Sequence, residues 1–363
     1  MRFHVVSLPH TNTTDAFCGC AYTEKVRKFC NMMFKLGHEV FLYAGETNEA
    51  HCTEHISCIT EAERAASCKD HYTSAPFDPQ LPHWIVFNSN VIKAMVPRLQ
   101  KEDFLCVIGG ICHQMISAAF PHITCVEFGI GYTGTFAKYR VWESYAWMHL
   151  VYGAQAQNHD AYRADGIWFD EVIPGYLEME RFPFGPREER GDYYMYLGRL
   201  IDRKGWKIAE EVCKYLGKRL IIAGVGDEPT YGEFVGVVGP EQRGELLRKA
   251  QALFVPSIYI EPFGNVAVEA QACGTPVICT DWGAFTETVV QGMTGYRCRT
   301  FQQFIDATEK VKTLDCKVIR HWAEENYSMD VIGLRYQEYF ERLLTLWGKG
   351  WYDVKEPRLE EAA

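Results

Sequence analysis

The sequence predicts an α/β protein with parallel β-sheets, divided into two domains. Short apolar runs that are typical of buried strands alternate with helix-like segments along most of the chain. The 363 residues exceed the size at which a single hydrophobic core keeps growing, and a hydrophobic content of 47% is enough for two cores. Strands joined by a helix normally lie parallel, so the loops that follow them gather at the carboxyl edge of the sheet, where ligands bind.

The first domain is expected to cover residues 1–184. It begins with a strand at 2–8, a polar loop, a helix at 24–37 and a second strand at 38–45, and residues 46–80 are polar and irregular. The runs HWIVFNS, FLCVIGG and PHITCVEFGIG are predicted as further strands, with VIKAMVPRLQ as a helix between the first two.

An aromatic-rich segment, YTGTFAKYRVWESYAWMHLVYG, follows these strands. Aromatic rings beside Lys138 and Arg140 suit the stacking of a sugar or of a base flipped out of DNA. Large rings are also the usual filling of hydrophobic cores, so an acceptor site and ordinary burial both stay open for this segment.

A linker and a second domain come next. Residues 185–191, GPREERG, combine glycine, proline and charge without apolar periodicity, which is typical of a linker. The second domain is expected over 192–330, and it starts with the strands YYMYLG and RLIIAGVGDEP. The run GAFTETVVQGMTGYRC is predicted as a helix and a turn, and residues 331–363 as an amphipathic helix and a tail.

The most informative stretch runs from Ala252 to Gly283. ALFVPS is a short apolar run, VAVEAQAC has a helical composition that ends at the Gly-Thr-Pro stop, and VICT is a second apolar run. This strand–helix–strand unit places the intervening loop at the carboxyl edge of a parallel sheet.

The chemistry of this loop points to a phosphate and to hydroxyl groups. Gly264 lets the backbone approach a ligand, and its N–H group, with those of Asn265 and Val266, begins a helix whose dipole favours phosphate oxygens. Glu261 is suited to accept hydrogen bonds from hydroxyls, and Glu269, about two helical turns on, is suited to accept a second set. Each glutamate alone is commonly just an exposed acid. Together with the glycine loop they predict a nucleotide sugar.

Two cations follow the strand YYMYLG. Arg199 and Lys204 lie in its exit turn, at the carboxyl edge of the second sheet, where they are placed to neutralise a diphosphate. The run G-R-L alone is a weak signal, and it gains weight from Glu261 and Glu269 at the expected separation.

The run E-P-F-G-N-V-A-V-E-A-Q-A-C-G-T-P-V-I closely resembles the E-x7-E signature of family 4 retaining glycosyltransferases. That family has the GT-B architecture, two Rossmann-like domains with parallel sheets facing a central cleft, and its C-terminal helix commonly crosses back to the first domain. The resemblance implies that Glu261 contacts the donor sugar, Glu269 holds the ribose, and Arg199 and Lys204 hold the leaving diphosphate. The donor-binding residues that it implies are Gly19, Gly198, Gly239, Pro240, Phe263, Gly264, Asn265, Val266 and Glu269.

The first domain departs from the family pattern. Relatives often carry paired glycines in the first loop, where this chain has only Gly19. Many also carry a histidine after the strand that ends here at Glu127, and that histidine is missing. Glu127 or Tyr132 is expected to do similar polar work on the acceptor side, and the alternative is that Glu127 is merely an acid at a strand end.

The predicted function is a retaining hexosyltransferase that uses a nucleoside-diphosphate sugar, with a UDP-sugar favoured, and an unidentified hydroxyl acceptor. Fixed cations and helix-end donors would stabilise the charge on the departing diphosphate. The resemblance implies that no metal is required, and no Asp-x-Asp motif lies between apolar strands; no cofactor is expected. The Cys/His cluster between His51 and His71 matches no standard metal-ligand spacing, and an ordinary surface insertion is favoured there.

Composition restricts the compartment and the partners. No apolar run reaches the length of a membrane span, the N-terminus lacks the features of a signal peptide, and 14 scattered cysteines suggest buried thiols, so a cytoplasmic protein is expected. The net charge of −10 disfavours indiscriminate binding to polyanions. A basic cluster on the first predicted helix, which includes Lys25, Arg27, Lys28 and Lys35, is interpreted as a solvated face.

Three alternatives stay open. A glycosyltransferase that acts on hydroxymethylated bases in DNA would use the aromatic segment and the Lys25 cluster. A nucleotide-sugar epimerase or a phosphorylase of the same fold would use similar cations. A non-catalytic nucleotide-sugar-binding protein would bind the ligand without turnover.

Overall fold

In a computed structural model, the described residues are 1–67, 71–156 and 165–345. The chain forms two compact units, and each is described separately. Of the described residues, the first unit contains those within Met1–Trp142, Asp165–Ile173 and 332–345, and the second contains 143–156 together with Pro174–Val331.

The first unit is built on a seven-stranded parallel sheet in the order β3-β2-β1-β4-β5-β6-β7. Its strands are β1 (Arg2–Val6), β2 (Glu39–Ala44), β3 (Glu54–Ser57), β4 (Phe104–Val107), β5 (Thr124–Ile130), β6 (Tyr139–Trp142) and β7 (Glu171–Val172). The order reverses between β1 and β4, which is the Rossmann pattern, and loops leaving these two strands flank the usual ligand position.

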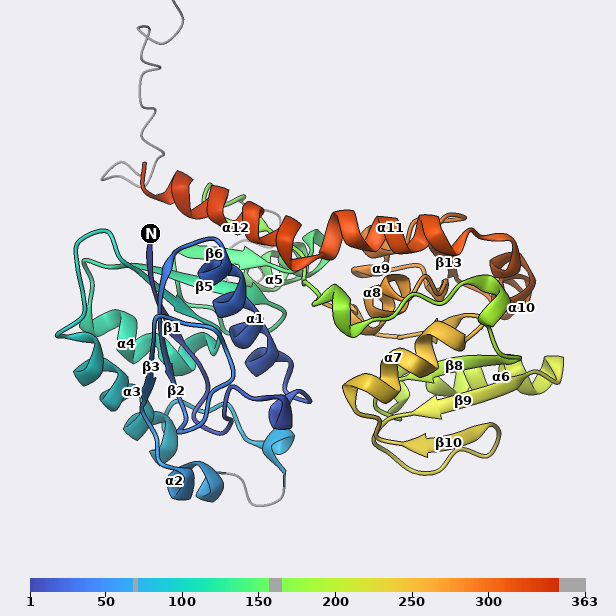
Figure 1. Ribbon diagram of the computed structural model, residues 1–363, viewed down its shortest axis with the longest axis horizontal. Coiled ribbons are helices and arrows are strands. Elements are labelled where there is room, and N and C mark those ends of the chain that lie inside the picture. Colours follow the sequence, from blue (N-terminus) through green and yellow to red (C-terminus); the bar gives the residue numbers. More distant parts are fainter. Residues whose placement is uncertain (68–70, 157–164, 346–363) are drawn as a thin grey trace, which may run out of the picture. The chain divides into compact units, whose positions relative to one another are not determined.

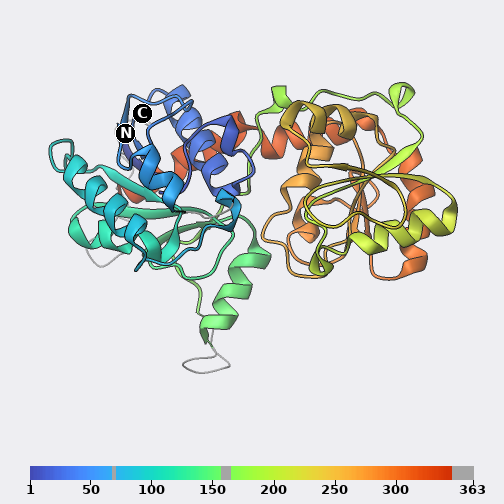
Figure 2. The same cartoon turned by 90° about the horizontal axis from the view of Figure 1, so that it is seen from below.

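Helices cover both faces of this sheet (Figures 1 and 2). They are α1 (Ala21–Lys35), α2 (Glu61–Ala66), α3 (Pro82–Met95), α4 (Gln114–Ala119) and α12 (Met329–Leu343). On one face, Phe87 of α3 and Ile116 of α4 pack with Leu105 of β4. On the other face, Phe340 of α12 packs on Phe3, with ring centroids 4.7 Å apart.

The second unit repeats the same design with a six-stranded parallel sheet in the order β10-β9-β8-β11-β12-β13. Its strands are β8 (Tyr193–Leu197), β9 (Arg219–Ala223), β10 (Glu233–Gly236), β11 (Leu253–Val255), β12 (Val277–Thr280) and β13 (Gly295–Cys298). The order reverses here between β8 and β11. This unit therefore has its own switch point.

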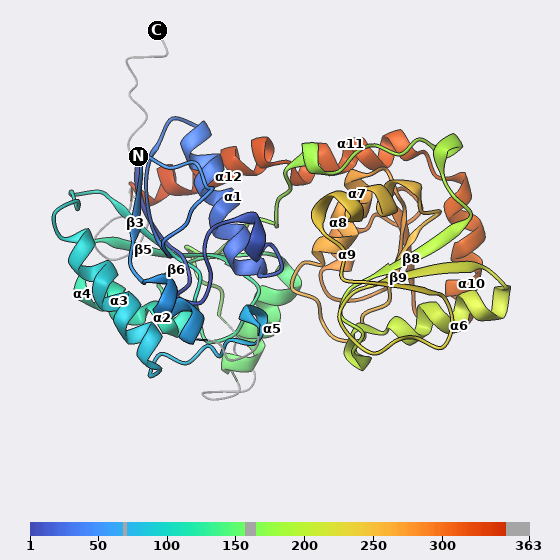
Figure 3. The ribbon, with the colours of Figure 1, turned by 60° about the horizontal axis from the view of Figure 1, so that its bottom comes forward.

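Two hydrophobic clusters lie on the two faces of the second sheet, and Figure 3 shows helices on both faces. The helices of this unit are α5 (Tyr145–Ala156), α6 (Trp206–Leu216), α7 (Pro240–Lys249), α8 (Asn265–Ala272), α9 (Phe285–Thr288), α10 (Phe301–Lys310) and α11 (Cys316–Tyr327). Helices α7 and α8 contribute Leu247 and Val268 to one cluster, and α6 and α10 contribute Val212 and Phe304 to the other. Both faces are apolar, as expected for a buried parallel sheet.

The predicted α/β class with two parallel sheets is confirmed, and three local predictions are wrong. HWIVFNS is not a strand but part of α3, which has Pro82 in its first turn and buries Trp84, Phe87, Val91 and Met95 at helical spacing. Residues 46–80 are not irregular throughout, because they contain β3 and α2. GAFTETVVQGMTGYRC contains the strand β13, whose short length left no periodic signal.

The division into units differs from the boundary expected at 184. The segment that begins at Glu143 belongs to the second unit, where Ser144 Oγ donates to the Pro262 carbonyl at 2.6 Å. Leu177 also belongs there, because its N–H donates to the Tyr327 carbonyl at 2.8 Å. The predicted linker is fixed by Arg190, whose guanidinium donates to the Gly274 carbonyl at 2.6 Å. The predicted tail at 346–363 lies outside the described residues.

Within residues 1–67, 71–156 and 165–345, no helix combines the length and the apolar character that crossing a membrane requires.

Candidate functional site

The candidate site lies where two loops of the second unit meet at its switch point. One loop leaves β8 and contains Arg203, Lys204 and Gly205, and the other leaves β11. Gly205 has φ +68°, and a Cβ placed on it would lie 1.9 Å from the Pro256 carbonyl oxygen. The Ile258 N–H donates to the Arg203 carbonyl at 2.9 Å. Glycine at position 205 is therefore needed for the two loops to touch.

Lys204 and Glu261 form an ion pair across these loops. Lys204 Nζ donates to Glu261 Oε1 at 2.6 Å, and Ser257 Oγ donates to the same oxygen at 2.7 Å. The Glu261 side chain is 5% exposed and the Lys204 side chain 22% exposed. The structure thus brings together the cation and the acid that the sequence singled out on separate loops.

Tyr259 connects this pair to a second cation. Its hydroxyl donates to Glu261 Oε2 at 2.5 Å, and the Arg203 guanidinium lies 3.9 Å from its ring centroid. The Lys204 ammonium lies 5.0 Å from the same centroid. Burial and the Glu261 carboxylate raise the pKa of Tyr259, so the hydroxyl stays a proton donor. Sequence reasoning missed Tyr259, Ser257 and Arg203, although all three flank residues that it named.

Arg199, the second predicted cation, is exposed and forms no ion pair with any residue in the described part of the chain. It follows β8 after Gly198, and its charge acts on the pKa of Tyr259 and of Tyr196. Its backbone carbonyl accepts from the Tyr196 hydroxyl at 2.9 Å, which fixes the start of the loop next to Gly198. The guanidinium is therefore free to bind an anion beside the Lys204–Glu261 pair.

The N-terminus of α8 adds backbone donors to this edge. Gly264 is the N-cap residue with φ +83°, and a Cβ there would lie 2.6 Å from the Phe285 ring. No side chain caps the helix. Because the first amides of a helix have no intrahelical acceptor, those of Asn265 and Val266 are available to an anionic group.

Glu269 is held on the second turn of α8 by Arg243 of α7. Arg243 Nη1 lies 3.2 Å from Glu269 Oε1 and 3.3 Å from Oε2, and the Glu269 side chain is 9% exposed. Sequence reasoning missed Arg243, because only the three-dimensional packing of α7 on α8 pairs these two residues. Gly239 caps α7, and Pro240 is its first residue.

Phe263 does not present its side chain to this edge. Its ring is 2% exposed, belongs to the core of the second unit and lies 5.7 Å from the Tyr327 ring. A Cβ on Gly175 would lie 2.5 Å from it. Phe263 anchors the loop, since an apolar ring this deeply buried has no surface for a ligand. Gly19 belongs to the first unit, where a Cβ on it would meet the Tyr72 hydroxyl at 2.7 Å.

Glu127 and Tyr132, the predicted acceptor-side pair, support a loop of the first unit. Glu127 is fully buried, and its Oε2 accepts from the amides of Phe136 and Ala137, both at 2.8 Å. Tyr132 donates to Oε1 at 3.2 Å. Burial raises the pKa of Glu127, although these three donors oppose the rise. The carboxylate is thus occupied by the chain itself.

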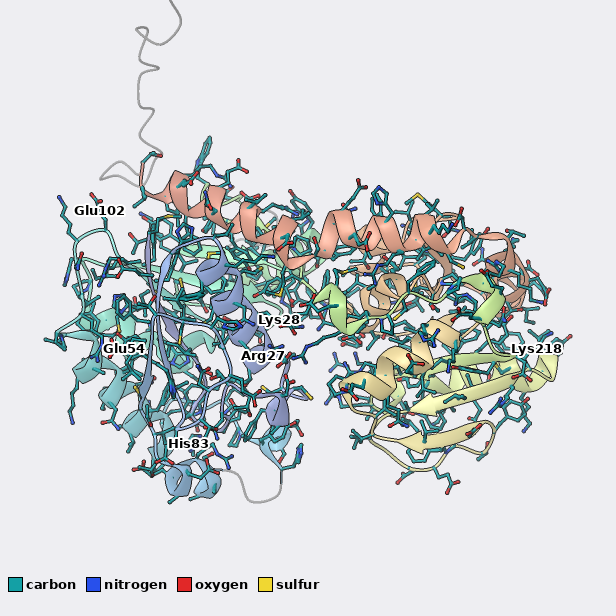
Figure 4. All side chains as sticks on the ribbon, viewed as in Figure 1. Arg27, Lys28, Glu54, His83, Glu102 and Lys218 are labelled. Atoms are coloured by element: carbon teal, nitrogen blue, oxygen red, sulfur yellow. The ribbon has the colours of Figure 1, made fainter. Side chains whose placement is uncertain are left out.

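The aromatic segment and the basic cluster are also engaged internally. Arg140 and Trp142 donate to Asp170 at 2.9 and 2.7 Å. Lys25 is 9% exposed and donates to the Gly129 carbonyl at 2.9 Å. Arg27, which Figure 4 labels on α1 beside Lys28, is 4% exposed and donates to Glu24 at 3.0 Å. The expected solvated basic face is therefore wrong for Lys25 and Arg27, which are buried.

Among residues 1–67, 71–156 and 165–345, no group of three or more His, Cys, Asp or Glu side chains is placed to hold a metal ion. Cys68 of the predicted Cys/His cluster lies outside the described residues. His55 Nε2 donates to the Gly45 carbonyl at 2.9 Å, because a carbonyl oxygen can only accept, so this ring fixes a strand end.

Comparison with known proteins bears directly on the second unit. Residues 179–329 match the family described as glycosyl transferases group 1. This match contains Lys204, Arg243, Glu261 and Glu269 and covers less than half of the chain. The chain is 34% identical over 147 residues to glycogen synthase of Mycobacterium tuberculosis, which is 35% of each protein. It is 27% identical over 215 residues to D-inositol 3-phosphate glycosyltransferase of Rhodococcus erythropolis, 47% of this chain and 48% of that protein. The chain thus spans about a third to a half of the curated relatives that it matches.

Solved structures resemble the whole chain. Sucrose-phosphate synthase of Thermosynechococcus elongatus has a TM-score of 0.68 at 15% identity, over 95% of this chain and 99% of that one. A glycosyltransferase involved in avilamycin A biosynthesis has a TM-score of 0.67 at 18% identity, over 95% and 98%. HepE of Anabaena, in complex with UDP and glucose, has a TM-score of 0.64 at 13% identity, over 94% and 99%. The chain has the GT-B fold.

Proposed function

We propose that this protein is a retaining glycosyltransferase that moves a hexose from a nucleoside-diphosphate sugar, with a UDP-sugar favoured, to a hydroxyl acceptor. The observation that carries the proposal is the switch point of the second unit. There the Lys204–Glu261 ion pair lies beside the exposed Arg199 and close in sequence to the uncapped N-terminus of α8.

Each group at this edge has a role in binding the donor. Arg199 and Lys204 bind the diphosphate, because cations at this position neutralise its charge. The amides of Asn265 and Val266 add hydrogen-bond donors to the phosphate oxygens. Glu261 accepts hydrogen bonds from the hexose hydroxyls, and Glu269, held by Arg243, accepts them from the ribose.

The transfer step needs stabilisation of a leaving group. The bond between the anomeric carbon and the diphosphate oxygen breaks, and a bond to the acceptor oxygen forms on the same face of the sugar. The acceptor proton moves to the departing phosphate oxygen. Negative charge grows on the diphosphate during this step, so Arg199 and Lys204 lower the barrier more than they tighten the ground state.

The comparisons support the proposal in two ways. The matched family covers the residues of the site, and the chain has the fold of proteins that include a glycosyltransferase and an Anabaena protein in complex with UDP and glucose. The relatives are named for the use of different acceptors, so they leave the acceptor of this chain unassigned.

The test is product analysis with the full chain. We expect UDP release from UDP-glucose or another UDP-hexose to depend on Lys204 and to increase when a hydroxyl acceptor is added. We also expect the new glycosidic linkage to keep the anomeric configuration of the donor, which NMR coupling constants measure. Interconversion of the sugar without UDP release would identify an epimerase, and release that requires inorganic phosphate would identify a phosphorylase. Binding without turnover would identify a non-catalytic binder, and transfer only to hydroxymethylated DNA would identify the DNA-modifying alternative.

A further inference from the structure

The loop that carries Glu261 is held at two consecutive backbone carbonyls. The Ala284 N–H donates to the Glu261 carbonyl at 3.2 Å, and Ser144 Oγ donates to the Pro262 carbonyl at 2.6 Å. Proline has no N–H, so its carbonyl is the only backbone group through which hydrogen bonds can hold Pro262. The next residue, Phe263, is anchored by its buried ring. The Ser144 hydroxyl therefore acts on the loop between Glu261 and this anchor.

The Ser144 hydroxyl has two bonds with different requirements. Ser144 directly precedes α5, and its Oγ accepts from the Trp147 N–H at 3.1 Å, which is the contact of an N-cap residue. Capping needs only the acceptor of the hydroxyl, whereas the bond to Pro262 needs its proton. Ser144 is 1% exposed, so bulk water cannot replace either partner. The second bond is therefore a feature that capping alone does not explain.

Glu287 of α9 shares the capping of α5, and Figure 3 labels both helices. Its Oε2 accepts from the Tyr145 N–H at 3.0 Å, and its Oε1 accepts from the Ala146 N–H at 2.8 Å. No contact from the Glu287 side chain to Pro262 occurs among these bonds. The cap of α5 and the bond to the Pro262 carbonyl can thus be removed separately.

The segment between β12 and α9 supports the backbone of Glu261 from another side. Gly283 has φ +61°, and a Cβ on it would lie 2.9 Å from the Glu261 nitrogen. Ala284, which donates to the Glu261 carbonyl, is fully buried. These are backbone contacts. The Ser144 hydroxyl is the side-chain contact in this support, and a point substitution can remove it.

The position of Glu261 matters because the donor is one molecule. Its hexose and its diphosphate are covalently joined, so Glu261 and the amides at the start of α8 can bind both only at one separation. Helix α8 is fixed by its own core residues, such as Val268, whereas Glu261 depends on contacts of its loop. A misplacement of about 1 Å in a reacting arrangement costs about 10²-fold in rate.

We propose that Ser144 is a positioning residue for the transfer reaction. Through the Pro262 carbonyl it sets the place of Glu261 relative to the amides at the start of α8, so that the hexose and the diphosphate bind together. Because Ser144 is buried, it acts through Pro262 and not by touching the donor. The assignment rests on the proposed function.

The first test compares two substitutions of Ser144 in the full chain. In Ser144→Ala we expect kcat with a UDP-hexose to fall about tenfold or more, because Glu261 is no longer held in place. The Kd for UDP should stay within about twofold, because UDP lacks the hexose that Glu261 binds. Ser144→Thr keeps a hydroxyl that caps and donates, so its kcat should stay within about threefold of the wild type. Steady-state kinetics and calorimetric titration with UDP measure these effects.

Glu287→Gln is the matched control for the cap. A carboxamide has only one acceptor oxygen, so this variant weakens the cap of α5 and keeps the bond from Ser144 to Pro262. We expect its melting temperature to fall by about 2–4 °C, as in Ser144→Ala, because each loses one capping bond. Its kcat should stay within about threefold of the wild type, since Glu261 keeps its place.

A further variant covers the case in which Ser144→Ala does not fold. Ser144→Asp still accepts from the Trp147 N–H, but its carboxylate cannot donate to the Pro262 carbonyl. It should lose kcat as Ser144→Ala does. The proposal is overturned if the folded variant without the donor keeps kcat within about threefold, if Ser144→Thr loses as much as Ser144→Ala, or if Glu287→Gln loses as much turnover as Ser144→Ala.

Hydrogen exchange adds a measurement that does not depend on turnover. The Ala284 amide reports on the Glu261 carbonyl to which it donates. We expect it to exchange about fivefold or more faster in Ser144→Ala than in the wild type, and at the wild-type rate in Ser144→Thr.

The two measurements distinguish this proposal from the proposed function. A wild type without turnover, together with faster Ala284 exchange in Ser144→Ala, would remove the transferase and leave Ser144 as a support of the Glu261 loop. Wild-type turnover with unchanged kcat and unchanged exchange in Ser144→Ala would keep the transferase and remove the role of Ser144.

Discussion

The two sheets share one strand order, yet the groups that gather at their switch points differ in kind. In the second unit, the loops after β8 and β11 carry charges that are paired across the edge, Lys204 with Glu261. In the first unit, the loops after β1 and β4 carry His10 and His113, whose buried imidazoles are neutral at pH 7, and Glu127 of the neighbouring strand β5 accepts hydrogen bonds from two backbone amides. The same topology thus supplies a place for a ligand, and the loop residues decide whether that place suits a charged or a neutral group.

The largest effect is expected from removing a charge at the switch point of the second unit. Lys204→Ala removes the ammonium from the diphosphate site, and we expect turnover of a UDP-hexose to fall about 10²- to 10³-fold, as for loss of a donor aimed at developing charge. Steady-state kinetics measure it. Lys207→Ala is the matched control, because Lys207 is 59% exposed and pairs with the exposed Asp202. An equal loss in Lys207→Ala would show that general charge, and not Lys204, matters.

A pair of matched substitutions distinguishes the structural role of Glu127 from the role of Glu261 in turnover. Glu127→Leu leaves two backbone amides and the Tyr132 hydroxyl without their acceptor, so we expect the free energy of unfolding to fall by about 3 kcal/mol. Glu261→Leu should instead reduce turnover at least about 100-fold, with a smaller change in the free energy of unfolding. Urea unfolding and kinetics on both variants measure the two effects. If Glu127→Leu left stability intact, its supporting role would be wrong.

Acid should weaken the first unit before the second. The pKa is lowered for five histidines of the first unit: His4, His10, His38, His83 and His113. In the described part of the second unit, His149 and His321 are exposed. Below pH 6.5 a histidine binds a proton in the unfolded state but not in the folded state, because its folded pKa is lower. The contribution of these histidines to the free energy of unfolding is therefore fully present above pH 6.5 and is lost as the pH falls toward the folded pKa.

For His10, with a folded pKa of about 4 set by burial and by the charges of His83 and Arg64, the loss at pH 5 is about 2 kcal/mol. Hydrogen exchange at pH 7.5 and pH 5, corrected for the intrinsic rate, should show the larger gain in exchange in β1 and β4. A larger gain in β8 and β11 would contradict the comparison.

The smallest expected effect tests Tyr259. Tyr259→Phe removes the hydroxyl that donates to Glu261 Oε2 and keeps the ring beneath Arg203. We expect kcat to fall about fivefold to tenfold with little change in KM, because the change loosens Glu261 without removing a contact to the phosphates. Tyr259→Leu, which also removes the ring, should cost more. Equal kinetics for the two variants would show that the Tyr259 ring does not contribute to turnover.

Much of the second unit could be predicted from the sequence. The run from Ala252 to Gly283 carries its strand, loop and helix signals in order, and they correspond to β11, α8 and β12. Lys204 and Glu261 were predicted separately, and the structure joins them. The partners Arg243 and Tyr259 could not be assigned, because a contact between α7 and α8, or between two loops, leaves no mark in local periodicity.

The first unit was less predictable. An apolar run read as a strand is α3, although Pro82 and the spacing of its buried side chains are signals of a helix. Glu127 was considered for acceptor binding, but a strand-end acid looks the same in the sequence whether it faces a ligand or backbone amides. His10 and His113 lie about a hundred residues apart, so only the sheet order brings them together.

The last helix has a practical consequence for experiments on isolated parts. The rings of Phe340 and Tyr336 fill space against Phe3 and Phe29, so β1 and α1 are only half enclosed without them. A fragment that ends at residue 142 would expose these faces and should aggregate when expressed alone. Adding a synthetic peptide that spans Met329–Leu343 should restore the solubility of this fragment by complementation. Any fragment designed to study the first unit alone should therefore include this helix.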